Sequence, residues 1–180
     1  EVPESATVLS RLIRSVYFLH ASLLEELVNT VQESLKSELN LEPVLDVVGK
    51  SKLDWGVYEA WAKGKTPEGI HLYRINGIEE DAWPNVHLVI GLGDGDLLWV
   101  GLGRFVGGEH QQSQGGGEFF GSIPGHTSNE WWLSWVTIPG LDPAAFDGSD
   151  GVARLADRDA LTEFAETVVD ICRQYLAILR

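Results

Sequence analysis

Two apolar runs joined by an Asp-Gly pair decide the fold that this sequence predicts. The first run reads VHLVIGLG over residues 86–93, the second reads LLWVGLGRF over residues 97–105, and Asp94-Gly95 lies between them. An Asp-Gly pair between strand-like runs is typical of a two-residue type I′ turn, which requires a positive φ at both turn residues. We therefore expect an antiparallel hairpin with its turn at Asp94-Gly95.

A two-residue loop also fixes the register of this hairpin. It pairs Ile90 with Trp99 and sets His87 beside Leu102 on a largely apolar face, where a satisfied core histidine is expected. Opposed residues share a face, and one apolar surface is expected from Val86, Leu88, Ile90, Leu92, Leu97 and Trp99. Since both faces are largely apolar, the hairpin is predicted to be central and covered on each side.

Glycines thin the predicted sheet at four positions: Gly91, Gly93, Gly101 and Gly103. A glycine inside a strand often marks a place where another group approaches the backbone closely. We expect a helix, or tryptophan rings from a neighbouring strand, to lie across this gap.

Helical patterns precede and follow the strands. Apolar residues recur at helical spacing from Leu9 to Leu35, with Ser5 or Thr7 as a start, Asn40 and Pro43 as an end, and a break expected near Ala21-Ser22. A second stripe begins at Leu161 and ends at Leu179, with Asp157 or Asp159 as its N-cap. Other strands are expected at residues 44–48, 55–61, 69–75 and 131–138.

Composition narrows the class of protein. The 180 residues carry 13 basic and 27 acidic side chains, a net charge of −14, which disfavours generic binding to nucleic acid phosphates. No apolar run approaches the roughly 20 residues that cross a bilayer, and we expect no membrane association. The single cysteine, Cys172, lies on an apolar stripe typical of an inert buried thiol. With no signal-like segment present, a cytoplasmic protein is expected.

Several enzyme classes lack their motifs. The sequence contains no G-x-S-x-G, no P-loop, no H-E-x-x-H and no lysine two positions after an acidic residue. Gly101-x-Gly103 lies within the predicted hairpin rather than between a strand and a helix, and dinucleotide binding is not expected. The acidic run Glu79-Glu80-Asp81 reads as a solvated turn, because adjacent carboxylates do not span a glycosidase cleft.

A glycine-rich segment, residues 107–128, is either a flexible loop or an ordered functional one. In the second case a set of polar residues is expected to converge on a ligand: Arg104, Glu109, His110, Glu118 and His126. Imidazole and carboxylate suit transition metals, but the spacing is not diagnostic, so no metal and no cofactor are predicted.

Aromatic residues cluster in the run NEWWLSW over residues 129–135. On a regular strand, Trp131, Leu133 and Trp135 share one face and Trp132 points to the other. One set is expected in the core, and the remaining ring is a candidate anchor for a partner protein or a flat ligand.

These observations predict one α+β domain over residues 1–180: a long N-terminal helix, a central antiparallel meander of about five to six strands, and a C-terminal amphipathic helix packed on the sheet. The preferred function is a non-enzymatic acidic binding or regulatory protein, similar to immunity, chaperone or inhibitor proteins, with a basic protein partner and an anchor at Trp131 and Trp132. Two alternatives stay open: a small-molecule or hydrolytic site under residues 107–128, and a degenerate nuclease-like fold. Fold alone does not choose between them.

Overall fold

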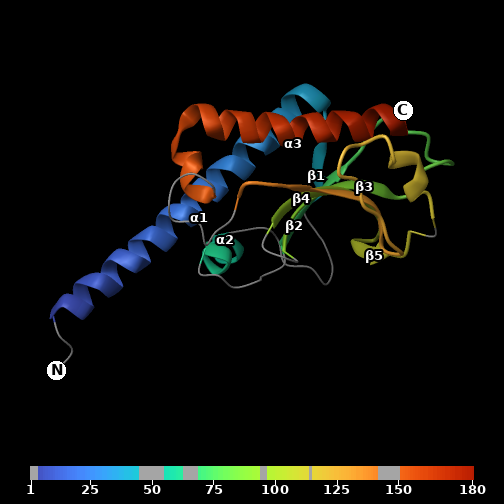
Figure 1. Cartoon of the computed structure of the whole chain (residues 1–180). Helices are drawn as coiled ribbons and strands as arrows, with labels where there is room; N and C mark the ends of the chain where they lie inside the picture. Colours follow the sequence, from blue (N-terminus) through green and yellow to red (C-terminus); the bar gives the residue numbers. More distant parts are fainter. Residues whose placement is uncertain (1–3, 45–54, 63–68, 94–96, 114, 142–150) are drawn as a thin grey trace.

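The computed structural model describes residues 4–44, 55–62, 69–93, 97–113, 115–141 and 151–180, and it confirms the predicted fold class. Two long helices lie along one face of a six-stranded antiparallel sheet (Figure 1). The strands are β1 (Glu42–Val44), β2 (Gly69–Arg74), β3 (Val86–Gly93), β4 (Leu97–Val106), β5 (Glu109–Gln111) and β6 (Trp132–Ile138). Their order is β1-β2-β3-β4-β5, and β6 pairs with β4 next to β5.

Helix α1 (Glu4–Leu39) is continuous, so the expected break near Ala21-Ser22 is wrong. Ala21 is fully buried in the core, and the packing of this face sustains a helix longer than usual. The helix begins by Glu4, so Ser5 and Thr7 are not its caps. Its end agrees with the prediction: Asn40 adopts a left-handed φ of 54°, and the next amide donates back to the carbonyl of Leu35 at 3.1 Å.

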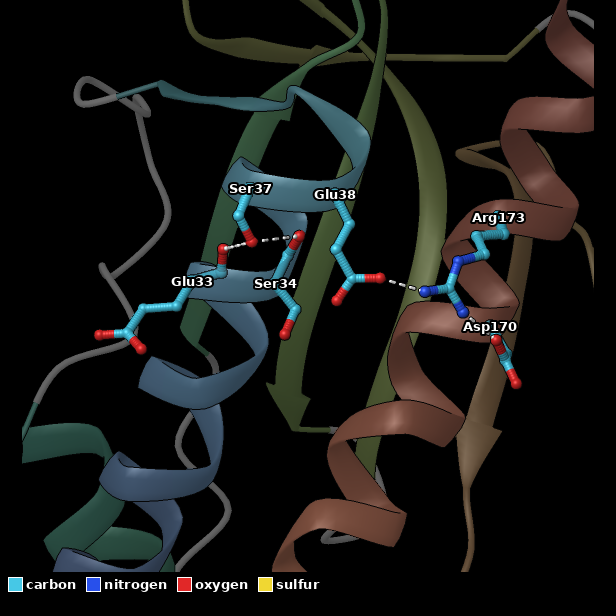
Figure 2. Close-up of polar contacts among 6 residues, drawn as sticks. All are labelled: Glu33, Ser34, Ser37, Glu38, Asp170 and Arg173. Atoms are coloured by element: carbon cyan, nitrogen blue, oxygen red, sulfur yellow. Dashed lines mark hydrogen bonds and ion pairs between the residues drawn. The ribbon is translucent and has the colours of Figure 1, made fainter.

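Helix α3 (Arg158–Leu179) starts at the predicted N-cap Asp157, whose carboxylate accepts hydrogen bonds from the amides of Asp159 and Ala160 at 2.8 and 3.2 Å. It packs against α1, and Arg173 bridges the two helices by binding Glu38 of α1 and Asp170 of its own helix (Figure 2). Exposed ion pairs of this kind add little stability, so the helix pair is held mainly by its apolar faces. None of the described helices combines the length and apolar character needed to cross a bilayer.

The central hairpin forms between β3 and β4, but its register differs by one residue from the prediction. Gly93 pairs with Leu97 and Ile90 with Val100, which leaves three residues between the strands instead of two. Residues 94–96, including Asp94-Gly95, lie outside the described residues. Since a slip of one residue turns every side chain of a strand to the other face, Trp99 leaves the predicted apolar surface and His87 faces Gly103 instead of Leu102.

The residues predicted as a strand at 55–61 form helix α2 (Trp55–Ala62). A short apolar run fits either periodicity, and tertiary contact decides here: Val57 and Tyr58 are buried, and α2 packs on α1. The ring of Trp55 lies 5.0 Å from that of Phe18. The strand predicted at 44–48 is present as β1 up to Val44, and its remainder lies outside the described residues.

The described part of the glycine-rich segment is ordered. Gly107 and Gly108, with φ of 58° and 84°, form a two-residue turn that pairs Val106 with Glu109 and so creates β5, which the sequence did not predict. A short 3-10 helix, η1 (Gly117–Phe120), follows, and Phe120 is fully buried in the core. A second, η2 (Val152–Ala156), precedes α3.

Strand β6 contains an irregularity that overturns the predicted alternation of its tryptophans. Its partners on β4 shift between Leu102 and Gly103, so that Trp135 pairs with Gly101 and Trp132 with Gly103. A β-bulge places two residues of one strand opposite one of the other. As a result, Trp132 and Trp135 share a face, while Leu133 belongs to the core on the opposite side.

Candidate functional site

The sheet has two chemically different faces. We call the side that packs on α1 and α3 the helix face; its central side chains are Leu88, Ile90, Val100 and Leu102. We call the opposite side the aromatic face; the rings that contact one another there are His87, Trp99, Phe105, His110 and Trp132. The separate small apolar cluster on the aromatic face also contains Ile70, Leu72 and Val89.

Glycines make room for these rings, which are one of the two kinds of cover, helix or tryptophan rings, that the sequence predicted. A Cβ atom added to Gly91 would lie 2.1 Å from the indole of Trp99, and one added to Gly103 would lie 2.9 Å from that of Trp132. Trp99 and Trp132 contact each other edge to face, with ring centroids 4.8 Å apart. The rings therefore lie directly on backbone that carries no side chain.

His110 joins this cluster from β5. Its imidazole stacks on Phe105 with centroids 4.7 Å apart and a tilt of 15°, and it lies 4.2 Å from the ring of Trp132. On its outer side is Trp131, at 5.7 Å. Trp131 is 42% exposed, whereas Trp132 is half-buried. The accessible ring is therefore that of Trp131, and Trp132 belongs to the packed ring cluster.

The turn that carries Trp131 is held by polar contacts. The side-chain oxygen of Asn129 accepts hydrogen bonds from the amides of Trp131 and Trp132, both at 2.8 Å. Ser113, which is buried, donates from its amide to the carbonyl of Glu130 at 2.7 Å and from its hydroxyl to that of Asn129 at 3.0 Å. Exposed Trp131 is thus presented by a turn that is tied to the segment following β5.

Exposed carboxylates lie on this turn and on the segments that precede it in the chain. Glu130 precedes Trp131, and Glu109 begins β5 next to His110; both are exposed. Glu118 lies on η1, where its carboxylate accepts a hydrogen bond from the amide of Gly116 at 3.1 Å. The end of the sheet around Trp131 is therefore apolar and acidic together.

The five residues predicted to converge under the glycine-rich segment do not form one cluster. Arg104 pairs with Val86 of the helix face, whereas His110 pairs with Phe105 of the aromatic face, so the two point to opposite sides. The hydrogen bond of His126 is made to β6: its Nδ1 lies 2.7 Å from the hydroxyl of Ser134. In the part of the chain that the structure describes, no three metal-ligating side chains come together.

Ser134 and His126 form part of a buried polar chain that the sequence analysis missed. The hydroxyl of Ser134 also lies 2.8 Å from that of Tyr175 on α3, and both residues are fully buried. Burial raises the pKa of Tyr175 well above its usual range and keeps this phenol neutral. A serine beside a histidine is the arrangement of an activated nucleophile, but a fully buried hydroxyl offers no path to a substrate. We interpret the contacts of His126, Ser134 and Tyr175 as a structural link between β6 and α3, and we call this link the polar tie.

A pocket of about 730 Å³ borders the aromatic face. Its polar lining includes Arg74, Glu80, Asp81 and His87, and Phe105 connects it to the ring cluster. His87 donates from Nδ1 to the carbonyl of Asn85 at 2.9 Å. Desolvation lowers the pKa of His87 despite this hydrogen bond, so at neutral pH its Nε2 carries a lone pair.

The lone thiol lies in the core. Cys172 is fully buried on α3, and burial raises its pKa far above the ordinary value. A thiol that stays protonated is a poor nucleophile. This agrees with the apolar stripe on which the sequence places it.

Comparisons with known proteins give no relative: no protein-family model, no curated protein and no solved structure matches this chain significantly. We therefore infer its function from geometry and chemistry.

Proposed function

We propose that this chain is a non-enzymatic binding protein, and that the acidic, aromatic end of its sheet binds a basic protein partner. The observation that carries the proposal is Trp131, a 42% exposed indole backed by His110. The exposed carboxylate of Glu130 precedes it in the chain, and that of Glu109 precedes His110 on β5. We call these four residues the Trp131 edge.

Two effects favour binding at the Trp131 edge: burial of the aromatic ring and electrostatic attraction by the carboxylates. A large aromatic ring whose backbone is already fixed loses little conformational entropy when a partner covers it, and such rings dominate binding energy at interfaces. Acidic side chains around it attract a basic surface and raise the association rate. The net charge of −14 acts in the same direction over longer distances.

Peptides can take the place of the natural partner in a binding measurement. A display library of peptides is selected on the immobilised full chain, and dissociation constants of the selected peptides are measured by calorimetry. The proposal predicts peptides rich in lysine and arginine, with association that slows as salt rises from about 0.05 to 0.5 M because the Debye length shortens severalfold.

Variants of the Trp131 edge distinguish a specific site from general acidity. Trp131→Ala is expected to weaken binding about 30-fold, the effect of losing roughly 2 kcal/mol at an anchor. Glu109→Gln together with Glu130→Gln is expected to lower the association rate and the salt dependence. Phe18→Ala is the matched control, since Phe18 is 63% exposed but lies on α1. Selected peptides that bind Trp131→Ala as tightly as the wild type would contradict the proposal.

A second candidate function rests on the pocket of about 730 Å³ beside Gly107 and Gly108. Its volume is within the range of small-molecule sites, and it offers a cationic group at Arg74, a neutral imidazole at His87 and carboxylates at Glu80 and Asp81. A ligand with both an anionic and a cationic group fits this lining. Thermal-shift screening of amino acids and their derivatives tests it: a stabilising compound must lose its effect in Arg74→Gln.

A further inference from the structure

In Figure 1 the N-terminal half of α1 extends beyond the sheet and α3. Several of its large apolar side chains are exposed. We call residues 6–19 of α1 the arm. Its exposed large aliphatic residues are Val8 (51%), Leu9 (59%), Leu12 (58%), Ile13 (44%) and Leu19 (52%). At 100° per residue these five side chains lie within one half of the helix circumference. The arm is therefore an amphipathic helix. Helix α2 lies beside it at Phe18, whose ring is 5.0 Å from that of Trp55, while the five aliphatic side chains stay exposed.

The spacing of the arm matches a helix-pairing seam. Leu9, Leu12, Val16, Leu19 and Leu23 follow one another at intervals of three, four, three and four residues. This is the alternation by which two helices interlock side chains along a common line. Leu23, the last of the five, is already buried in the core, so the seam runs from the core into the arm without interruption.

Charge also distinguishes the arm from the rest of the molecule. Residues 5–24 contain no acidic side chain, the longest such stretch in the sequence, and the arm carries Arg11 and Arg14. In a chain with a net charge of −14, most surfaces of two copies repel each other. The arm is a surface on which two copies can meet without bringing carboxylates together.

The exposed area suits a pair of copies. Five aliphatic side chains, each about half exposed, leave apolar surface on the order of 500 Å² per chain, near the upper limit for monomeric proteins. Two arms that cover each other bury about 1,000 Å² in total, the size at which specific interfaces begin.

We infer that the chain self-associates through the arm, and that the second copy supplies an arm packed antiparallel to the first. In this arrangement Leu9 lies opposite Leu19 of the second copy, and Leu12 lies opposite its Val16, so one sequence complements itself about a twofold axis. The antiparallel orientation places the remainder of each chain, which is acidic, at opposite ends of the arm pair. A parallel pair would bring both acidic parts to the same end and raise their repulsion.

Mass measurement on the full chain tests the association. Light scattering after gel filtration, between about 1 and 100 μM, is expected to show a monomer–dimer equilibrium with a dissociation constant in the micromolar range. Leu12→Ser with Leu19→Ser is expected to weaken dimerisation at least tenfold while leaving the helical circular dichroism of the body intact. Val106→Ser is the matched control, because Val106 is 52% exposed on β4, away from the arm.

Cross-linking tests the orientation. In the antiparallel seam, Ser15 of one copy lies next to Ser15 of the second copy, near the twofold axis. Thr7 lies on the polar side of the helix. Ser15→Cys is therefore expected to give a disulfide-linked dimer under mild oxidation, and Thr7→Cys is not. The buried Cys172 does not compete.

A wild-type chain that stays monomeric at 100 μM would overturn the inference, as would a dimer unaffected by the two serine substitutions. Binding of the monomer to vesicles of anionic lipid through Leu12 and Leu19 would also overturn it, and would assign the arm to a membrane surface. Ser15→Cys and Thr7→Cys chains that cross-link equally would contradict the antiparallel seam.

Discussion

The two faces of the sheet share the same strands but solve the packing problem differently. On the helix face, aliphatic side chains such as Leu88, Val100 and Leu102 are fully buried against helices. On the aromatic face, Gly91 and Gly103 leave the backbone bare, and the rings of Trp99 and Trp132 lie on it.

This difference explains where a binding site can arise. A helix covers its face completely and leaves nothing for a ligand, whereas rings on a glycine platform stay half-exposed at their rim. The Trp131 edge and the pocket beside His87 are both found at the margin of the aromatic face. Substitutions on each face can show how far the two differ.

The largest effect is expected in the centre of the helix face. Leu88→Ala removes a fully buried side chain from the main core and is expected to destabilise the protein by about 2–5 kcal/mol. The neighbouring Val89 is equally buried but belongs to the aromatic face. Val89→Ala is expected to cost less, since fewer atoms are removed, as measured by urea denaturation. Equal losses, with fewer atoms removed at Val89, would show that the aromatic face is packed more tightly than the helix face.

The glycine platform is tested by adding one methyl group. Gly91→Ala places its Cβ where the Trp99 ring now lies, and the resulting overpacking is expected to destabilise the fold by about 1–3 kcal/mol. Trp99→Leu in the same chain is expected to recover part of this loss. A double-mutant cycle measures the coupling; strict additivity would show that the ring does not lie on Gly91.

The polar tie on the helix face is tested at Ser134. Ser134→Ala leaves the Tyr175 hydroxyl buried without this partner and is expected to cost about 1–3 kcal/mol. Ser134→Ala combined with Tyr175→Phe removes both polar groups and is expected to be less destabilising than the two single changes added together. If the Ser134→Ala variant unfolds at the same urea concentration as the wild type, the hydrogen bond between Ser134 and Tyr175 does not stabilise the fold.

The smallest effect is a dependence on pH that involves one histidine from each side of the sheet. Desolvation lowers the pKa of His87 on the aromatic face and of His20 on α1. The unfolded chain therefore binds protons below about pH 6.5 more readily than the folded chain does. The stability that the two neutral histidines contribute is therefore fully present above about pH 6.5. It is lost as the pH falls toward their lower pKa values in the folded protein.

Urea midpoints between pH 7.5 and 5.0 measure the effect. His87→Gln and His20→Gln are each expected to flatten the loss of stability on acidification. A His87→Gln variant that keeps the full wild-type slope would show that His87 is solvated in the folded protein.

Local sequence patterns correctly predicted those elements that depend least on tertiary contacts. The limits of β3, the N-cap at Asp157 and the buried stripe of α3 could be read from residue types and their spacing. The glycine positions also indicated that a helix or tryptophan rings would lie over the sheet, and the structure has the rings. These features depend on neighbours in sequence, so the sequence contains their signal.

Features that depend on a single inserted residue escaped prediction. The pairing of Gly93 with Leu97, one residue later than predicted, puts Trp99 on the opposite face, and the bulge in β6 puts Trp132 and Trp135 on the same face. The sequence of residues 107–128 shows no recognisable pattern for β5, which carries His110, because a strand of three residues is too short to show alternation. The sequence therefore indicated Trp131 and His110 as candidate residues without indicating their contact with each other.

The sequence by itself determined the class of fold, the order of most of its elements and the net negative charge, because periodicity, turn residues and charge are properties of the chain. Only the tertiary structure decided that α2 is a helix, which tryptophan is exposed and which histidines are separated. These outcomes depend on register and on packing between segments far apart in the chain. A shift of one residue changes them completely while leaving the local pattern unaltered.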